Sequence, residues 1–266
     1  MTDETSPTLE QAARASLAAG KARARLFEFD GRRYVVKRLA EQSRGLLQIL
    51  FMRWVVRYVT GQPLPLRTLA LNQKAGGMDY EAKRLINLAA AGVRVPEVVL
   101  VLPELFVLEY CGTVVSTLLE KWTPEVWRPQ LLTLARELGE FHRAGHWHGG
   151  AQIKNLTQFD GHNWRIDFEE NFGEFLPLAA SQANDLVIFL NSVSLAGPID
   201  EAEARQLLPQ LIDAYFAAHP SLMVRTVIRR AKPLLRLAAG VASPFQRWSR
   251  KGIRRIIVLA DILREV

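Results

Sequence analysis

Residues 148–155 read His-Gly-Gly-Ala-Gln-Ile-Lys-Asn, and Asp167-Phe168-Glu169 follows twelve residues after that asparagine. Strand-like pieces lie near both, at 155–158 and 164–168. An asparagine and an aspartate at the ends of two adjacent short strands can converge on one divalent cation. Oxygen ligands of this kind suit Mg²⁺, which completes its shell with water and phosphate. Taken alone, Asn155 is better explained as a turn cap and Asp167 as a partner of a nearby base.

The chain before these segments predicts a small β-rich half. The expected strands are 24–29, 33–39, 93–101 and 105–110. Asp30-Gly31 favours a tight hairpin between the first two, because glycine accepts positive φ without strain. Lys37 lies in the second strand, where a lysine needs an acidic or phosphate partner or else faces solvent. Residues 79–91 read as a helix ended by a glycine, with Glu81 near its start.

After Cys111-Gly112 the pattern changes from strands to helices. Thr123-Pro124 offers a capping side chain and a proline at the first helical position, and apolar residues at helical spacing follow to about residue 145. Further helices are expected at 182–193, at 200–218 and through the C-terminal tail. The sequence therefore predicts an α+β chain, β-rich and then mainly helical, with a cleft near Cys111-Gly112.

In this order, the segments resemble the protein-kinase-like superfamily. The resemblance covers about residues 16–218 and is greatest to a divergent bacterial branch with the lipopolysaccharide-core (Kdo/heptose) kinases and the RIO-type small kinases. It implies a two-lobed kinase-like fold that binds ATP and Mg²⁺. Lys37 matches the strand lysine that holds the nucleotide phosphates, and Glu81 matches its ion-pair partner. Asn155 and Asp167 match the metal-binding positions.

The resemblance also implies the remaining nucleotide contacts. Residues 108–112 resemble the hinge, so the backbone from Glu109 to Cys111 would meet the adenine ring. Gly20 and Lys21 lie where the family has its phosphate loop, here with one glycine instead of three. Lys21, Arg23 and Arg25 are candidate phosphate contacts, although solvated strand residues explain them equally well.

The resemblance also implies roles for two positions in or beside the family's catalytic loop. Asp185 resembles the aspartate that accepts backbone N–H groups of this loop, and His148 is interpreted as a scaffold residue within it. The loop aspartate itself, five residues before the metal asparagine, falls at Gly150. A positioned base of this kind contributes about 10² to 10⁴-fold, so its loss slows phosphoryl transfer without abolishing it.

Two interpretations follow from Gly150. Another carboxylate can replace the base, and the candidates are Asp160, Glu169 and Glu170. Alternatively, the protein is a pseudokinase, a scaffold from a different functional class that docks a partner at a membrane. Retention of Lys37 and the metal positions favours an enzyme or at least a nucleotide-binding protein.

The charge distribution indicates an anionic partner. The chain has 34 Lys and Arg against 27 Asp and Glu, a net charge of +7 with a pI near 9.8. Such a balance is typical of proteins that bind nucleic acid, phosphate ligands or membrane surfaces. Residues 221–266 hold eleven basic and two acidic residues, which is +9. Residues 1–220 therefore carry −2, and the basicity is a property of the tail.

The segment Leu46–Val59 is the most apolar stretch of the chain. As a helix, its fourteen residues would reach about 21 Å, less than the roughly 30 Å of a hydrocarbon core. A short cationic helix of this kind can lie in the lipid interface. Packing against the tail as core is an equally good alternative. The mixture of apolar and basic residues in the 221–266 tail also favours a membrane over an RNA partner.

Together these observations predict an N-lobe at 1–112 with an apolar basic insertion at about 44–77, a helical C-lobe at 113–220 and a basic helical extension at 221–266. The leading interpretation is a phosphotransferase that uses ATP and Mg²⁺ on a hydroxyl of a membrane-borne glycolipid, by resemblance to the lipopolysaccharide-core kinases. The single cysteine fits a reducing compartment, so the chain is expected in the cytoplasm, peripheral on the inner membrane. An RNA-associated kinase-like protein is the weaker alternative.

Overall fold

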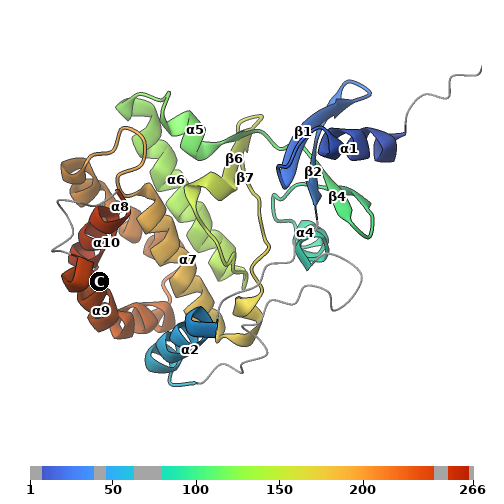
Figure 1. Ribbon diagram of the computed structural model, residues 1–266. Helices are drawn as coiled ribbons and strands as arrows, with labels where there is room; N and C mark the ends of the chain where they lie inside the picture. Colours follow the sequence, from blue (N-terminus) through green and yellow to red (C-terminus); the bar gives the residue numbers. More distant parts are fainter. Residues whose placement is uncertain (1–7, 39–45, 63–79, 243–250, 264–266) are drawn as a thin grey trace, which may run out of the picture.

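The computed structural model describes residues 8–38, 46–62, 80–242 and 251–263. A four-stranded antiparallel sheet in the order β1-β2-β4-β3 forms a small lobe, and most helices gather in a larger lobe (Figure 1). The α+β architecture predicted from the sequence, an antiparallel sheet followed by a mainly helical part, is confirmed. The strands of the small lobe are β1 (Ala24–Phe29), β2 (Arg32–Arg38), β3 (Val98–Val101) and β4 (Leu105–Glu109).

The two faces of this sheet have different neighbours. Val36, Leu105 and Val107 pack with α1 (Leu9–Ala18), which begins with the expected Thr8 capping box. Lys37 follows Val36 in β2, so its side chain points to the opposite face, where its register partner Phe106 joins the main core. The pleat of β2 therefore directs Lys37 towards α4 and the helical lobe.

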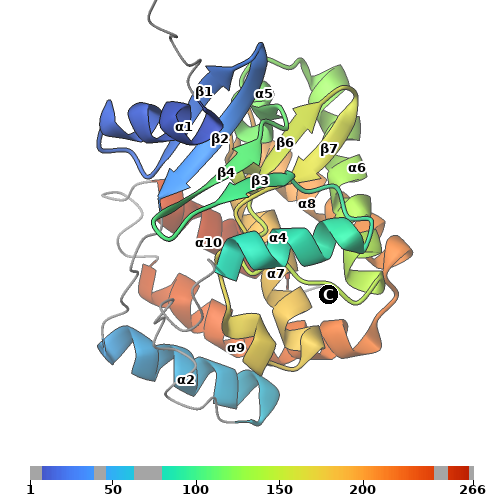
Figure 2. The ribbon, with the colours of Figure 1, turned by 90° about the vertical axis from the view of Figure 1, so that its right-hand side faces the viewer.

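The helix α4 (Tyr80–Ala90) lies across that second face, between the sheet and the helical lobe (Figure 2). It ends, as expected, at Gly92, whose φ of +78° lies in the left-handed region. Its inner residues Glu81, Leu85 and Leu88 are buried. Only the last part of the expected strand 93–101 pairs with β4, starting at Val98.

The larger lobe begins just after Gly112 and contains a second, three-stranded sheet. Its elements are β5 (Thr113–Val114), α5 (Val115–Leu119), α6 (Pro124–Arg143), η1 (Ile153–Asn155), β6 (Leu156–Phe159), β7 (His162–Arg165), η2 (Phe172–Phe175), α7 (Leu178–Val193) and α8 (Glu201–Ala218). The strand expected at 164–168 is wrong in its bounds. The ladder ends at Arg165, and Asp167 has a φ of +69°, which no strand residue adopts.

The tail forms α9 (Leu222–Ala242) and α10 (Lys251–Ile262), which pack on α7 and α8. Val224, Ile228 and Leu259 are buried in the same core as the larger lobe. Part of the tail is thus structural core. The tail residues 243–250 and 264–266 lie outside the described residues.

The apolar segment forms α2 (Leu46–Thr60), which lies against α9 in both views (Figures 1 and 2). Its packing on the tail is the alternative that the sequence left open. The other parts of the predicted insertion, 44–45 and 63–77, lie outside the described residues. Among the residues that the structure describes, no helix combines the length and apolarity needed to cross a bilayer.

Candidate nucleotide and metal site

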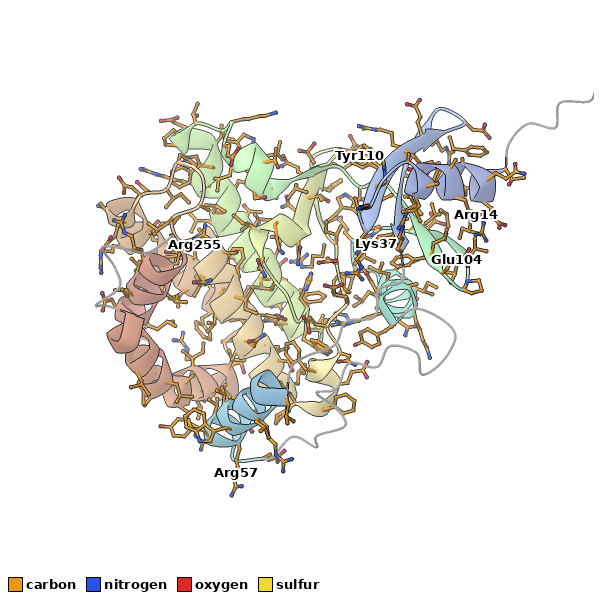
Figure 3. All side chains as sticks on the ribbon, in the orientation of Figure 1. Arg14, Lys37, Arg57, Glu104, Tyr110 and Arg255 are labelled. Carbon is orange, nitrogen blue, oxygen red and sulfur yellow. The ribbon has the colours of Figure 1, made fainter. Side chains whose placement is uncertain are left out.

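The Lys37 ammonium donates hydrogen bonds to two carboxylates from different parts of the chain. Its Nζ lies 2.7 and 2.9 Å from the two carboxylate oxygens of Glu81 and 2.8 Å from Oδ1 of Asp167. Glu81 is fully buried, whereas the Asp167 side chain keeps 28% of its surface exposed. Figure 3 shows Lys37 on the small lobe, at the side that faces the helices of the larger lobe. The structure therefore brings together three of the four residues expected to form the catalytic centre.

These contacts fix the charges of the group. Burial by itself would lower the pKa of Lys37, but the carboxylates of Glu81 and Asp167 outweigh it and raise that pKa. Burial likewise opposes ionisation of Asp167, yet the Lys37 ammonium outweighs it and lowers the pKa of the aspartate. Lys37 is therefore protonated and Asp167 is ionised at neutral pH.

Asn155 lies beside this group at the end of η1. Its backbone carbonyl accepts from the N–H of Ile166 at 3.0 Å, which places the asparagine next to the segment of Asp167. Its Nδ2 donates to the Gly150 carbonyl at 2.8 Å. Its Oδ1 has no hydrogen-bond partner among the described residues. The amide oxygen and the exposed carboxylate are hard donors that fit Mg²⁺.

The backbone from His148 to Gly150 is held by hydrogen bonds to Asp185 and to the His148 ring. The N–H groups of His148 and Gly149 donate to the two carboxylate oxygens of Asp185, the second at 2.7 Å. The His148 ring donates through Nε2 to the Ile166 carbonyl and accepts at Nδ1 from the Gly150 N–H. Complete burial lowers the pKa of His148 to about 4, so the ring is neutral, as this bonding requires. His148 is thus a scaffold residue.

The three candidate replacements for the missing base have different positions. Asp160 lies in the β6–β7 turn, at the opposite end of the hairpin from Asn155 and Asp167, so it is wrong as a candidate. Glu169 forms an ion pair with Arg23, and its carboxylate lies within 4.8 Å of those of Glu81 and Asp167. Glu170 lies beside the catalytic loop, since its Cβ would be 2.7 Å from a Cβ added at Gly149.

The phosphate-loop candidates are only partly brought to the site. Arg23 approaches it through Glu169, while Lys21 is exposed. Gly20 accepts a hydrogen bond from Arg38 at 3.1 Å, and a Cβ on Gly20 would meet the guanidinium of Arg25. Contact of these residues with phosphate stays a prediction.

The segment 108–112, where a hinge was expected, runs from the end of β4 to β5 of the second sheet. The N–H of Glu109 donates to the Glu97 carbonyl, and that of Tyr110 donates to the Arg33 carbonyl. The Cys111 N–H has no backbone hydrogen-bond partner among the described residues. Burial raises the pKa of the Cys111 thiol, which contacts the Thr157 hydroxyl at 3.3 Å. Cys111 is therefore unsuited as a nucleophile, and the cleft and the adenine contact stay predictions.

Sequence reasoning missed Arg84, which reaches the backbone of the larger lobe from α4. It donates to the backbone carbonyls of Trp147, His148 and Glu170. Its position three residues after Glu81 was the only sequence signal, and a basic residue on a helix is usually solvated.

No family model matches the sequence, and no curated protein matches it. Among solved structures, the chain is similar to "WaaP in complex with acyl carrier protein". The two share 18% sequence identity over 84% of each chain, with a TM-score of 0.47.

Proposed function

We propose that the protein binds ATP with Mg²⁺ between the two lobes and transfers the terminal phosphoryl group to a hydroxyl of a membrane-borne glycolipid. The observation that carries the proposal is the contact of one buried lysine with both Glu81 and Asp167. A buried lysine is stable only with partners of opposite charge. Here it joins a fully buried glutamate to an aspartate that is still open to solvent, so phosphate and cation can reach the group.

Each residue has a distinct task in this proposal. Lys37 neutralises phosphate oxygens, and Glu81 fixes the direction of its ammonium group. Asp167 and Asn155 offer the oxygens that would hold Mg²⁺, which neutralises charge on the triphosphate when bound. Phosphoryl transfer depends mainly on positioning and charge neutralisation. Gly150 supplies no base, so the proposal predicts a slow enzyme.

The proposed membrane contact uses the outer side of α2. Leu46, Leu50, Trp54 and Tyr58 are spaced four residues apart, so they share one side of the helix, and each is 47–68% exposed. Arg57 is exposed next to them and points away from the molecule (Figure 3). An apolar stripe with cationic neighbours and no acidic residue on the helix fits an anionic lipid surface. An RNA partner would not require the apolar stripe.

ATP turnover in the presence of vesicles tests the catalytic proposal. We expect turnover by the wild-type chain to rise when anionic glycolipid is added, and to be lost in Lys37→Ala. Lys83→Ala is the control, because Lys83 is exposed on the same helix as Glu81. Turnover that survives in Lys37→Ala would refute the assignment of the site.

Vesicle flotation tests the membrane contact separately. Deleting the tail is unsuitable, because α9 and α10 contribute core residues. We expect Leu50→Gln/Trp54→Gln to reduce recovery with anionic vesicles. Leu26→Gln/Val126→Gln removes two apolar residues of similar exposure elsewhere and should leave recovery unchanged. Equal recovery of both double variants would remove α2 from the proposal.

One observation favours a second function. With glycine at position 150, the loop can bind a nucleotide without efficient transfer, which is the property of a pseudokinase scaffold. In that case Mg²⁺-dependent ATP binding is retained and turnover is absent with every acceptor.

A further inference from the structure

Arg84 lies on α4, three residues after Glu81, and its guanidinium enters the larger lobe. Nη1 donates to the carbonyls of His148 at 3.1 Å and Glu170 at 3.0 Å, and Nη2 donates to the carbonyl of Trp147. The guanidinium carbon also lies 3.7 Å from the centre of the Trp147 ring. One side chain thus binds three backbone carbonyls from two segments and stacks on an aromatic face.

Asp185 accepts hydrogen bonds from the N–H groups of two peptide units whose carbonyls bind Arg84. The unit between Trp147 and His148 has its carbonyl on Arg84 and its N–H on Asp185. The unit between His148 and Gly149 is bound in the same way. Each peptide dipole therefore has a cation at its negative carbonyl end and an anion at its positive N–H end. Charge-assisted bonds of this kind are stronger than neutral ones.

Hydrogen bonds connect these two peptide units to Asn155 and to the segment of Asp167, the positions proposed to bind the metal. The Gly150 N–H donates to the His148 ring, and the Gly150 carbonyl accepts from the Asn155 amide. On the other side, Arg84 binds the carbonyl of Glu170, three residues after Asp167. Displacement of the guanidinium would therefore loosen both segments that offer oxygens to a cation.

We propose that Arg84 is a positioning residue that clamps the peptide units from Trp147 to Gly149 against Asp185. Because Glu81 and Arg84 are on one helix, the clamp fixes Asn155 and Asp167 relative to the Lys37–Glu81 pair. The helix α4 thereby couples the two lobes at the site. The consequence for Mg²⁺ and ATP rests on the proposed function, whereas the clamp itself does not.

The chemistry of the clamp requires arginine. A planar guanidinium has five donors in a fixed fork and can stack on an indole while it donates in its own plane. A lysine has one flexible ammonium group and cannot reach three carbonyls in two segments with the same stacking. Lys83, one residue earlier, is exposed and gives a matched control on the same helix.

Hydrogen exchange of the backbone amides tests the clamp without any nucleotide. In Arg84→Gln we expect the amides of His148 and Gly149 to exchange about ten times faster or more, the effect of weakening one charge-assisted bond. These amides do not contact Arg84, so the change must pass through the peptide units. Arg84→Lys should not restore protection, and Lys83→Gln should leave exchange unchanged. Unchanged exchange in Arg84→Gln, or equal acceleration throughout α6 and α8, would overturn the clamp.

A binding measurement tests the connection to the metal positions. We expect Arg84→Gln to keep the affinity for ATP measured without Mg²⁺ and to lose most of the gain that Mg²⁺ gives the wild-type chain. If Arg84→Gln keeps that gain, Arg84 is not a positioning residue for the site. If the wild-type chain binds no ATP at all, the proposed function fails, and the exchange experiment still decides the clamp.

Discussion

Replacing Gly150 by aspartate would supply the carboxylate that the loop lacks. A Cβ added at Gly150 would lie 3.5 Å from the Asn155 amide nitrogen and 4.0 Å from Nδ1 of His148. Both are ordinary van der Waals contacts, and the backbone here does not have the positive φ that would exclude a side chain. The loop is also held by Asp185 through its neighbours. We therefore expect Gly150→Asp to fold with its loop unchanged.

The size of the effect follows from the chemistry of the missing group. A positioned general base contributes about 10² to 10⁴-fold to a proton-transfer step. This corresponds to about 3 to 5 kcal/mol of transition-state stabilisation, at 1.36 kcal/mol for each factor of ten. Mg²⁺-dependent ATP affinity should change little, because Lys37, Asn155 and Asp167 are retained. The gain should therefore appear in kcat rather than in KM for ATP.

The assay is ATP turnover by the purified chain, with water or glycolipid as the acceptor. Gly150→Asn is the matched control, because it has the shape of aspartate but cannot accept the proton. We expect a gain of at least about a hundredfold for Gly150→Asp and none for Gly150→Asn. A folded Gly150→Asp chain that binds ATP with Mg²⁺ but turns over no faster than the control would refute this reasoning.

Three further predictions concern stability. Lys37→Met removes the ammonium that contacts the fully buried Glu81, so the free energy of unfolding in urea should fall by about 3 to 5 kcal/mol, and adding Glu81→Gln should recover much of it. Because His148 has a native pKa of about 4 against an ordinary value of 6.5, the unfolded chain binds more protons between these pH values. Stability should therefore fall with decreasing pH in this window, by about 2 kcal/mol from this residue at pH 5, and urea titrations of wild type and His148→Gln should differ accordingly. A Cβ at Gly112 would lie 2.0 Å from the Gln158 carbonyl, at a φ of +103°, so Gly112→Ala should lower Tm by several degrees in calorimetry, and an unchanged Tm would contradict the contact.

The parts of the fold that the sequence predicted well depend on local chemistry. Asp30-Gly31 fixes its hairpin because both residues accept positive φ, and the structure has them at +48° and +71°. The helix around Glu81 ends at Gly92 for the same local reason. The pairing of Lys37 with Glu81 was implied only by the resemblance, because the residues taken alone left Lys37 free to face solvent.

The parts that sequence reasoning missed depend on contacts between distant segments. Arg84 binds carbonyls 63 to 86 positions away, and no local pattern distinguishes it from the exposed Lys83. The left-handed φ of Asp167 ends the extended backbone before this residue, so the strand expected at 164–168 was given the wrong bounds. For α9, the mixture of apolar and basic residues favoured a membrane surface, and only the structure shows that Val224 and Ile228 are core.

The central claim is that Lys37, Asn155 and Asp167 form a site for ATP with Mg²⁺. Titration calorimetry with ATP, with and without Mg²⁺, tests it most directly in the wild-type chain and in Asp167→Asn. We predict that Mg²⁺ strengthens ATP binding to the wild-type chain at least about tenfold, the equivalent of 1.4 kcal/mol, and that Asp167→Asn loses this gain. Binding that is independent of Mg²⁺, or a gain that Asp167→Asn keeps in full, would contradict the account.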